Sequence, residues 1–331
     1  VTLHRDTAAW CPYCEKVWLL LEEKRIPYFV KKVPLSCYGK KPQSFLTINP
    51  QGGLPVAVID GRVMAESNDI LFFLDKAFPS PQHPPMLQGG QGEIQALMQL
   101  ERQAFSVWFR WLTSSGDQSQ QMRNVLNKVD RALADASSQG PYFQGRFSMV
   151  DILFTPFLER MAASLPYYKG KSFEVRCADF PHLLKWYQAM DARPAYIGLK
   201  SDYYTHVHDL PPQIGGCVKD GAGAAYRGRI DGGDWRVEVA GGGCFEPMMP
   251  EDPQEACREV GVGVGVGMFY VYVCFICCML YMLYYMSLLT PTPLSTHLFS
   301  DTYCTYYVLY VLHSGGAQPA LQPRRSLPLQ Q

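Results

Sequence analysis

Two cysteines near the start of the chain have the spacing of a redox pair. Cys11 and Cys14 lie in the segment Trp10–Cys14, of sequence WCPYC, which follows a short β-like run and opens a helical segment. Free backbone N–H groups and the positive end of the helix dipole stabilise a thiolate there, and they lower a cysteine pKa from ~8.5 into the range ~3.5–7.5. The thiolate is the attacking species in disulfide exchange, so we expect Cys11, at the N-cap, to be the nucleophile. Cys14 lies one turn further along the same side, where it can resolve a mixed disulfide.

Two other interpretations of this pair remain open. A Cys-x-x-Cys pair is also half of a zinc site, but structural zinc sites are usually four-coordinate, and no further ligands lie close by in the sequence. The second alternative is a pair of inert helix cysteines, because reactivity requires exposure. A strand followed directly by a helix favours a thioredoxin-like redox site, and we expect no metal.

Two further segments have the residue types of a peptide-binding site. Gly52–Pro55 stands before a predicted strand. A cis proline there would leave the backbone of Leu54 free to pair with an extended peptide, while a trans proline at the first residue of a strand fits the spacing equally well. Glu66 and Ser67 precede a helix whose first N–H groups could receive a carboxylate, with Ser67 as the N-cap. A simple cap without a ligand is equally compatible with that pattern.

The elements that must position these residues alternate in type over residues 1–79. The predicted order is β-α-β-α-β-β-α, and its strongest local signal is Asp60-Gly61 between two apolar runs, which predicts a hairpin with a type I′ turn. The predicted elements are Val1–His4, Cys11–Lys24, Tyr28–Val33, Lys41–Ile48, Val56–Ile59, Arg62–Ala65 and Ser67–Ala77.

The next part of the chain reads as helical. Residues 80–90 are rich in Pro and Gly and predict a linker, and residues 91–200 carry apolar side chains at helical spacing. Ser148 and Asp151 form a capping-box pattern, to which we assign a structural role. The fold class expected is an α/β domain followed by an all-α domain. The predicted helices are Gln91–Ser114, Gln118–Ala136, one from Ser148 past Phe157, His182–Met190 and Ala195–Lys200.

The composition excludes some classes of protein. Thirty basic residues balance thirty acidic ones, so we expect no broad electrostatic surface for nucleic acid. The eleven cysteines are scattered along 331 residues and odd in number, unlike a secreted disulfide framework. We therefore expect a reducing compartment for the folded part. Because the chain opens at Val1 rather than Met, we also expect that its natural start, with any transit peptide, is missing.

The chain after residue 200 is different in character. Residues 201–258 are rich in Gly and Pro with weak periodicity and read as an extension of uncertain order. Residues 259–290 form an apolar segment, in which 268–289 is long enough to cross a membrane as a helix. The alternating Val and Gly of 260–267 favour the other interpretation, a translated DNA repeat that is not native coding sequence. Residues 291–331 read as a disordered tail.

These features together resemble the cytosolic glutathione transferase family over about residues 1–200. The similarity is to its cysteine-type classes: omega, lambda, dehydroascorbate reductase and especially the iota-like class with a glutaredoxin-style Cys-Pro-Tyr-Cys. The resemblance implies a thioredoxin-like, glutathione-binding domain over 1–79 and an all-helical bundle domain over 91–200. It also makes a homodimer one expectation, since many members of the family are dimers.

The resemblance implies a role for each matching residue. Cys11 corresponds to the catalytic cysteine that forms a mixed disulfide with glutathione, the co-substrate. The residues implied to hold glutathione are Tyr13 beside that cysteine, Leu54 and Pro55 for its cysteinyl part, Glu66 and Ser67 for its γ-glutamyl end, and Lys41 for its glycyl carboxylate.

One departure from the family bears on the chemistry. Omega-like enzymes usually lack a cysteine at the position of Cys14, so its presence favours dithiol chemistry or the iota-like class. The function expected is a glutathione-dependent thiol transferase that acts on a small or protein disulfide or electrophile, by deglutathionylation or dehydroascorbate reduction. The alternative is a binding protein of the same fold, of the chloride-intracellular-channel or prostaglandin-synthase type. The expected location is the cytoplasm or plastid stroma, or a membrane if 268–289 is a genuine span.

Overall fold

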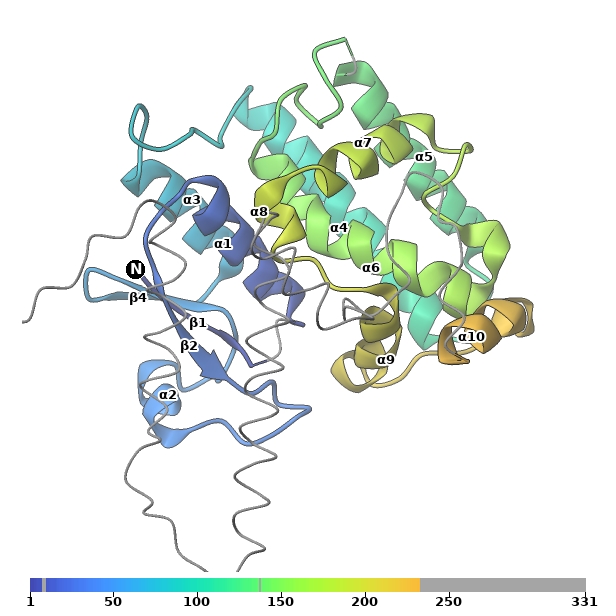
Figure 1. Ribbon diagram of the computed structural model, residues 1–331, viewed down its shortest axis with the longest axis horizontal. Helices are drawn as coiled ribbons and strands as arrows, with labels where there is room; N and C mark the ends of the chain where they lie inside the picture. The colour runs from blue at the N-terminus through green and yellow to red at the C-terminus, as the bar shows by residue number, and fades with distance from the viewer. Residues whose placement is uncertain (8–9, 137, 233–331) are drawn as a thin grey trace, which may run out of the picture. The chain divides into compact units, whose positions relative to one another are not determined.

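The computed structural model describes residues 1–7, 10–136 and 138–232, and it begins with a four-stranded sheet. The strands are β1 (Thr2–Asp6), β2 (Phe29–Val33), β3 (Val56–Ile59) and β4 (Arg62–Met64), in the spatial order β2-β1-β3-β4. β2 runs parallel to β1, whereas β3 is antiparallel to both β1 and β4. The helices of this part are α1 (Pro12–Glu23), α2 (Gln43–Ile48) and α3 (Ser67–Ala77), as Figure 1 shows.

The hairpin between β3 and β4 has the turn that the sequence predicts. Asp60 and Gly61 both have positive φ, at 48° and 83°, as a type I′ turn requires. This turn sets the register in which Ala57 pairs with Met64, and it therefore fixes where the chain leaves the sheet toward α3.

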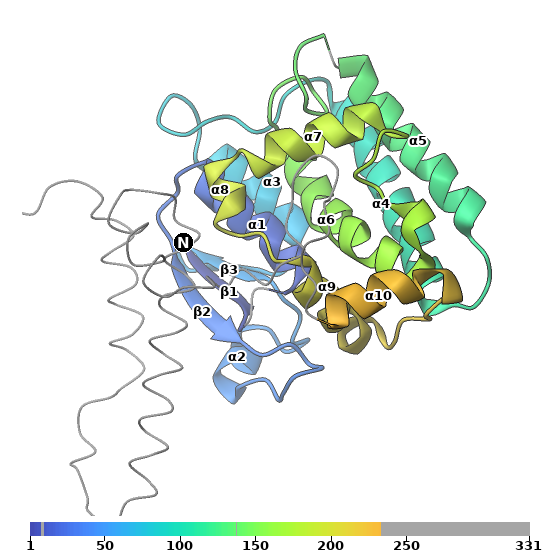
Figure 2. The same ribbon diagram turned by 45° about the vertical axis from the view of Figure 1, so that its right-hand side comes forward.

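The second part of the chain is helical. Its segments are α4 (Gln91–Thr113), α5 (Ser119–Ala136), α6 (Met149–Lys169), η1 (Lys171–Phe173), α7 (Pro181–Asp191), α8 (Pro194–Ile197), α9 (Tyr203–Ile214), η2 (Gly221–Gly223) and α10 (Ala224–Asp231). The expected order, an α/β part followed by an all-α part, is confirmed. In Figure 2, α1 lies between the sheet and α6, and it packs against both α3 and α6.

Helix α6 is the centre of the helical part, because its side chains are buried along its whole length. The predicted capping box starts it: the Asp151 carboxylate accepts the N–H of Ser148 at 2.9 Å and its hydroxyl at 3.0 Å. Asp151 also accepts the indole N–H of Trp186 at 2.9 Å. Burial raises the pKa of Asp151 to about 6, because it disfavours the charged carboxylate. The hydrogen bonds that Asp151 accepts act in the opposite direction and offset part of this cost.

Two local expectations differ from the structure. The helix α3 begins at Ser67 with Glu66 at the N-cap, one residue earlier than the predicted cap. Within the extension left open by the sequence, Tyr203–Ile214 form α9 and Ala224–Asp231 form α10. Residues 233–258 of that extension, the apolar segment 259–290 with the candidate span 268–289, and the tail 291–331 lie outside the described residues. A search of the described residues found no helix with the length and apolarity to cross a membrane.

Candidate active site

The sheet register brings the predicted site residues to one edge. β1 runs toward Asp6, and the chain then passes to Cys11; Val56 pairs with His4, so Pro55 lies beside the carboxyl end of β1. Antiparallel β4 returns to the same edge, where Glu66 and Ser67 begin α3. Parallel β2 also ends there, with Val33 opposite Asp6, and leads toward Lys41. Residues distant in sequence thus meet at the edge from which Cys11 emerges.

Cys11 is the N-cap residue of α1, as predicted. Its backbone is extended (φ −76°, ψ 116°), and Pro12 occupies the first helical position, where its fixed φ suits the helix and its missing N–H costs nothing. The backbone N–H groups of Tyr13 and Cys14 interact with the Cys11 sulfur and favour its thiolate. Cys11 is 5% exposed.

The two thiols of the pair differ in acidity. A hydrogen bond from the Cys14 thiol, helped by the helix N–H groups, lowers the pKa of Cys11, although burial and nearby Asp6 act in the opposite direction. Burial, followed by the interaction with Cys11, holds the pKa of Cys14 well above its usual range. Cys14 is 1% exposed. One sulfur is therefore prepared as the nucleophile, and the other is a protonated donor beside it.

Asp6 belongs to the site although the sequence analysis did not single it out. Its carboxylate accepts the N–H of Trp10 at 2.6 Å, which fixes the segment leading to Cys11. One ligand atom from each of Asp6, Cys11 and Cys14 lies within 4.8 Å of the other two, and all three residues are buried. Its place at the end of β1, five residues before the first cysteine, is the signal that could have identified it.

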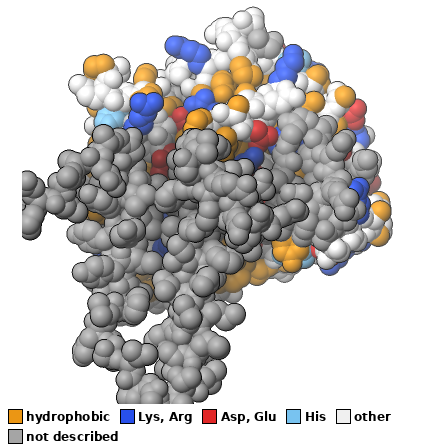
Figure 3. Space-filling view, in the orientation of Figure 1, with side chains coloured by type: hydrophobic (Ala, Val, Ile, Leu, Met, Phe, Trp, Pro, Cys, Tyr) orange, Lys and Arg blue, Asp and Glu red, His pale blue; other side chains and the backbone are white. Residues whose placement is uncertain are grey.

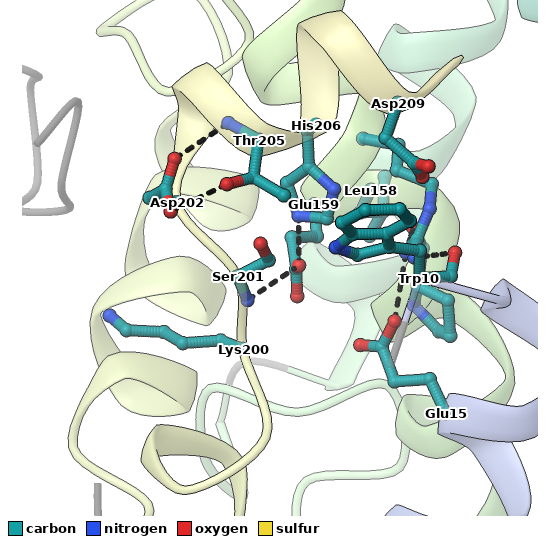
Figure 4. Close-up of polar contacts among 12 residues, drawn as sticks. Trp10, Glu15, Leu158, Glu159, Lys200, Ser201, Asp202, Thr205, His206 and Asp209 are labelled. Atoms are coloured by element: carbon teal, nitrogen blue, oxygen red, sulfur yellow. Dashed lines mark hydrogen bonds and ion pairs between the residues drawn. The ribbon is translucent and has the colours of Figure 1, made fainter. Parts of the chain in front are cut away.

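Arg160 of α6 joins the helical part to the cysteine segment. Its guanidinium donates to the Glu15 carboxylate at 2.8 Å and to the Trp10 carbonyl at 2.9 Å, and its side chain is 2% exposed. Gln213 of α9 donates to the same carbonyl at 3.2 Å. Figure 4 shows Trp10 and Glu15 from the first part of the chain facing residues of α6 and α9. The residue before the nucleophile is therefore held from the helical side.

Further buried polar groups extend this network into α9. Glu159 accepts a hydrogen bond from Nε2 of His206, from the Tyr196 hydroxyl at 2.8 Å and from the N–H of Ser201 at 3.3 Å. Burial lowers the pKa of His206 to about 3, so the imidazole is neutral at physiological pH. Burial, with Glu159 nearby, raises the pKa of Glu15, and Arg160, whose guanidinium pairs with the Glu15 carboxylate, acts in the opposite direction.

A second contact between the two parts lies next to Trp10. The Tyr38 hydroxyl donates to Asp209 of α9 at 2.5 Å, and the Tyr38 ring meets the Trp10 indole edge-on at 5.1 Å between centroids. Burial raises the pKa of Asp209 to about 6. These contacts cover the cysteine segment with α9, in a part of the chain whose sequence has only weak periodicity.

The residues expected to hold glutathione have distinct surroundings. The Leu54–Pro55 peptide bond is cis, the first of the two alternatives left open by the sequence, and Leu54 packs against Val33, Phe45 and Val56. Ser67 is buried and Glu66 exposed. The Lys41 ammonium donates to the Pro34 carbonyl at 2.8 Å, and burial lowers its pKa although Cys14 and Cys11 favour its charged form.

Tyr13 faces the helical part of the chain. Its ring meets Phe157 of α6 edge-on at 5.8 Å between centroids, and the Lys16 ammonium lies 5.6 Å from its centre. Burial lowers the pKa of Lys16 to about 8, while Glu101, with an oxygen 4.0 Å from the ammonium, favours its charged form. Tyr13 and Lys16 thus line the boundary between the two parts on the Cys11 side.

Comparisons with known proteins agree with this fold. The family model for the glutathione S-transferase N-terminal domain matches residues 10–77, and the family model for the C-terminal domain matches residues 101–197. The chain belongs to the glutathione S-transferase family. Its fold is the one expected: a thioredoxin-like N-terminal domain and a helical C-terminal domain.

Individual relatives point to the cysteine-type classes. The chain is 32% identical over 167 residues to the chloroplastic glutathione S-transferase DHAR3 of Arabidopsis thaliana, a match that covers 49% of this chain but only 59% of that relative. The solved structure of glutathione transferase Omega 3C from Trametes versicolor is 30% identical, with a TM-score of 0.52, over 61% of this chain and 89% of that one. Dehydroascorbate reductase of Chlamydomonas reinhardtii, 22% identical, shares the fold with a TM-score of 0.52 over 64% of this chain and 97% of that one.

The pH dependence of alkylation tests the electronic role of Cys14. The rate at Cys11 should fall as pH drops through the Cys11 pKa, because only the thiolate reacts, and the midpoint should lie below that of an ordinary thiol. Cys14→Ala should move the midpoint upward, since the largest stabilising contact of the thiolate is lost, and Cys14→Ser should restore part of the shift with a hydroxyl donor. Rates are measured by mass spectrometry of the Cys11 peptide. Equal midpoints in all three proteins would contradict this account.

Paired substitutions test the buried ion pair of Arg160 and Glu15. Arg160→Met should lower the free energy of unfolding by about 3–5 kcal/mol, because it leaves a buried carboxylate without its partner. Adding Glu15→Met should recover much of that loss, since an apolar pair removes the uncompensated charge. Denaturant unfolding measures the stability of the single and the double variant. The control is Arg123→Met, which removes an exposed ion pair with Asp179. If the double variant is less stable than Arg160→Met alone, the pairing is not the reason for the loss.

Proposed function

We propose that this chain is a glutathione-dependent thiol oxidoreductase whose nucleophile is Cys11. The observation that carries the proposal is the asymmetry of the pair: the pKa of Cys11 is lowered by the Cys14 thiol and by the helix N–H groups, while the pKa of Cys14 is raised. A hydroxyl nucleophile for conjugation has no comparable support in the sequence. Thiol transfer is therefore favoured over conjugation of electrophiles.

The first chemical step is an exchange at sulfur. The Cys11 thiolate attacks the glutathione sulfur of a glutathionylated substrate, an S–S bond to Cys11 forms, and the substrate sulfur leaves as a thiolate that takes a proton from solvent. The helix N–H groups that hold the Cys11 thiolate favour the departure of the same thiolate in the second step. Both steps use one set of fixed donors.

A second glutathione completes the cycle in the route that the structure supports best. Its thiolate attacks the glutathione sulfur of the mixed disulfide, glutathione disulfide leaves, and Cys11 returns as thiolate. Cys14 is a poor competitor in the resting state, because its raised pKa keeps it protonated and only the thiolate attacks. We therefore propose a monothiol cycle, with Cys14 tuning Cys11.

The glutathione site is proposed at the sheet edge beside Cys11. The cis Leu54–Pro55 segment lies there to pair with the cysteinyl part, and Glu66 and Ser67 lie at the start of α3, where helix N–H groups favour a carboxylate. Lys41 would receive the glycyl carboxylate by leaving the Pro34 carbonyl. Tyr13 would border the substrate on the helical side.

The class of second substrate rests on the relatives and on charge. A chloroplastic relative bears the name DHAR3, and a dehydroascorbate reductase shares the fold. These likenesses support dehydroascorbate as a substrate, in addition to glutathionylated disulfides. Its reduction takes two electrons and two protons, which two glutathione thiols supply. On the face shown in Figure 3, basic and acidic side chains of the described residues are interspersed. The described part of that face therefore shows no patch of one charge sign that would favour a polyanion.

Turnover of a glutathionylated small disulfide by the full chain tests the proposal. Cys11→Ser should reduce the rate to that of glutathione alone, because no thiolate remains at the helix start, whereas Cys14→Ser should retain most of it. Cys37→Ser is the matched control, since Cys37 is an exposed free thiol. If the parent itself does not exceed the background rate, the enzyme proposal falls, and glutathione binding without turnover would then support a binding protein.

A further inference from the structure

A carboxylate and two thiols form a compact group beneath the start of α1. Asp6 ends β1, and Cys11 and Cys14 occupy the N-cap and the first turn of the helix. One ligand atom from each lies within 4.8 Å of the other two. The group is held by fixed backbone on both sides, because β1 pairs with β2 and β3 and α1 packs against α6.

One oxygen of this group lacks a partner. Asp6 is 1% exposed, and its Oδ2 accepts the N–H of Trp10 at 2.6 Å. Its Oδ1 is buried and has no hydrogen-bond partner among the described residues. A buried, unpaired carboxylate oxygen is costly, so its retention beside two sulfur atoms calls for a ligand or a functional reason.

The donor set indicates which ligand fits. Thiolate sulfur selects soft and borderline cations, and zinc accepts sulfur and carboxylate oxygen together. Three protein ligands leave one position for a water or an external thiol, as in sites with exchangeable ligands. Cys11 is the most exposed of the three, so an ion would enter from its side.

We propose that the reduced chain binds one zinc ion through Cys11, Cys14 and Asp6. On binding, both thiols release their protons to solvent, two S–Zn bonds and one O–Zn bond form, and no electron is transferred. The third ligand comes from the end of the preceding strand, five residues before Cys11. Zinc and a disulfide at Cys11 exclude each other, since both use the same sulfur. As a consequence that rests on the proposed function, zinc blocks turnover reversibly.

Titration of the reduced full chain with Cd²⁺ tests the site directly. The readout is the near-ultraviolet thiolate-to-cadmium absorption, followed by displacement with Zn²⁺, in the presence of a phosphine reductant. Because the chain has eleven cysteines, the signal of this site is the difference between the parent and Cys11→Ser. We expect one equivalent in that difference, and we expect Asp6→Asn to weaken binding by at least about 10–100-fold, the loss typical even of outer-shell groups.

The controls separate this proposal from the enzyme proposal. Cys37→Ser and Asp69→Asn, both exposed positions, should titrate as the parent does. Oxidation of the parent to the Cys11–Cys14 disulfide, titrated without the phosphine, should lower the parent's own binding by one equivalent, and this comparison of oxidised with reduced parent needs no variant to fold. The proposal is overturned if parent and Cys11→Ser titrate identically, if Asp6→Asn binds as tightly as the parent, or if the oxidised parent keeps the signal. None of these readouts depends on turnover.

Discussion

The buried guanidinium of Arg160 is the contact on which the rest of this site depends. It reaches from the central helix of the helical domain to the Glu15 carboxylate and the Trp10 carbonyl, and it thereby fixes both the first turn of α1 and the residue before Cys11. Such a pair contributes little net stability once its desolvation is counted, but leaving one partner alone is costly. The two domains are therefore held in one relative arrangement, and the geometry of the nucleophile is set by residues about 150 positions away in the chain.

The chemistry of the site follows from the different environments of Cys11 and Cys14, which are three residues apart. Cys11 lies where helix N–H groups and a thiol donor converge, and Cys14 lies one turn deeper, where burial opposes charge. The same burial that makes Cys14 a poor nucleophile makes it a good donor. Asp6 adds a negative group below both sulfur atoms, which opposes the thiolate and at the same time completes a set of cation ligands. The site is therefore balanced between a reactive thiolate and a metal-binding dithiol.

Much of this could be predicted where the signal is local. The Asp60-Gly61 turn, the capping box at Ser148 and the N-cap position of Cys11 each depend on a few neighbouring residues, and each has the expected form in the structure. Arg160 and Asp209 could not be assigned, because the partners Glu15 and Tyr38 are distant in sequence and a charged residue is ordinarily expected at the surface. The sequence around α9 does not indicate a helix, because Pro211 and Pro212 oppose one locally. Tertiary contacts with α6 stabilise the helix instead.

Location of the mixed disulfide tests the central claim most directly. The Cys14→Ser variant of the full chain would be treated with glutathione disulfide near neutral pH, and the modified peptide identified by mass spectrometry under non-reducing conditions. The account predicts glutathione on Cys11 at short times, ahead of the exposed Cys37, because its thiolate is stabilised despite its burial. Modification of Cys37 first, with Cys11 left free, would contradict the assignment of the nucleophile.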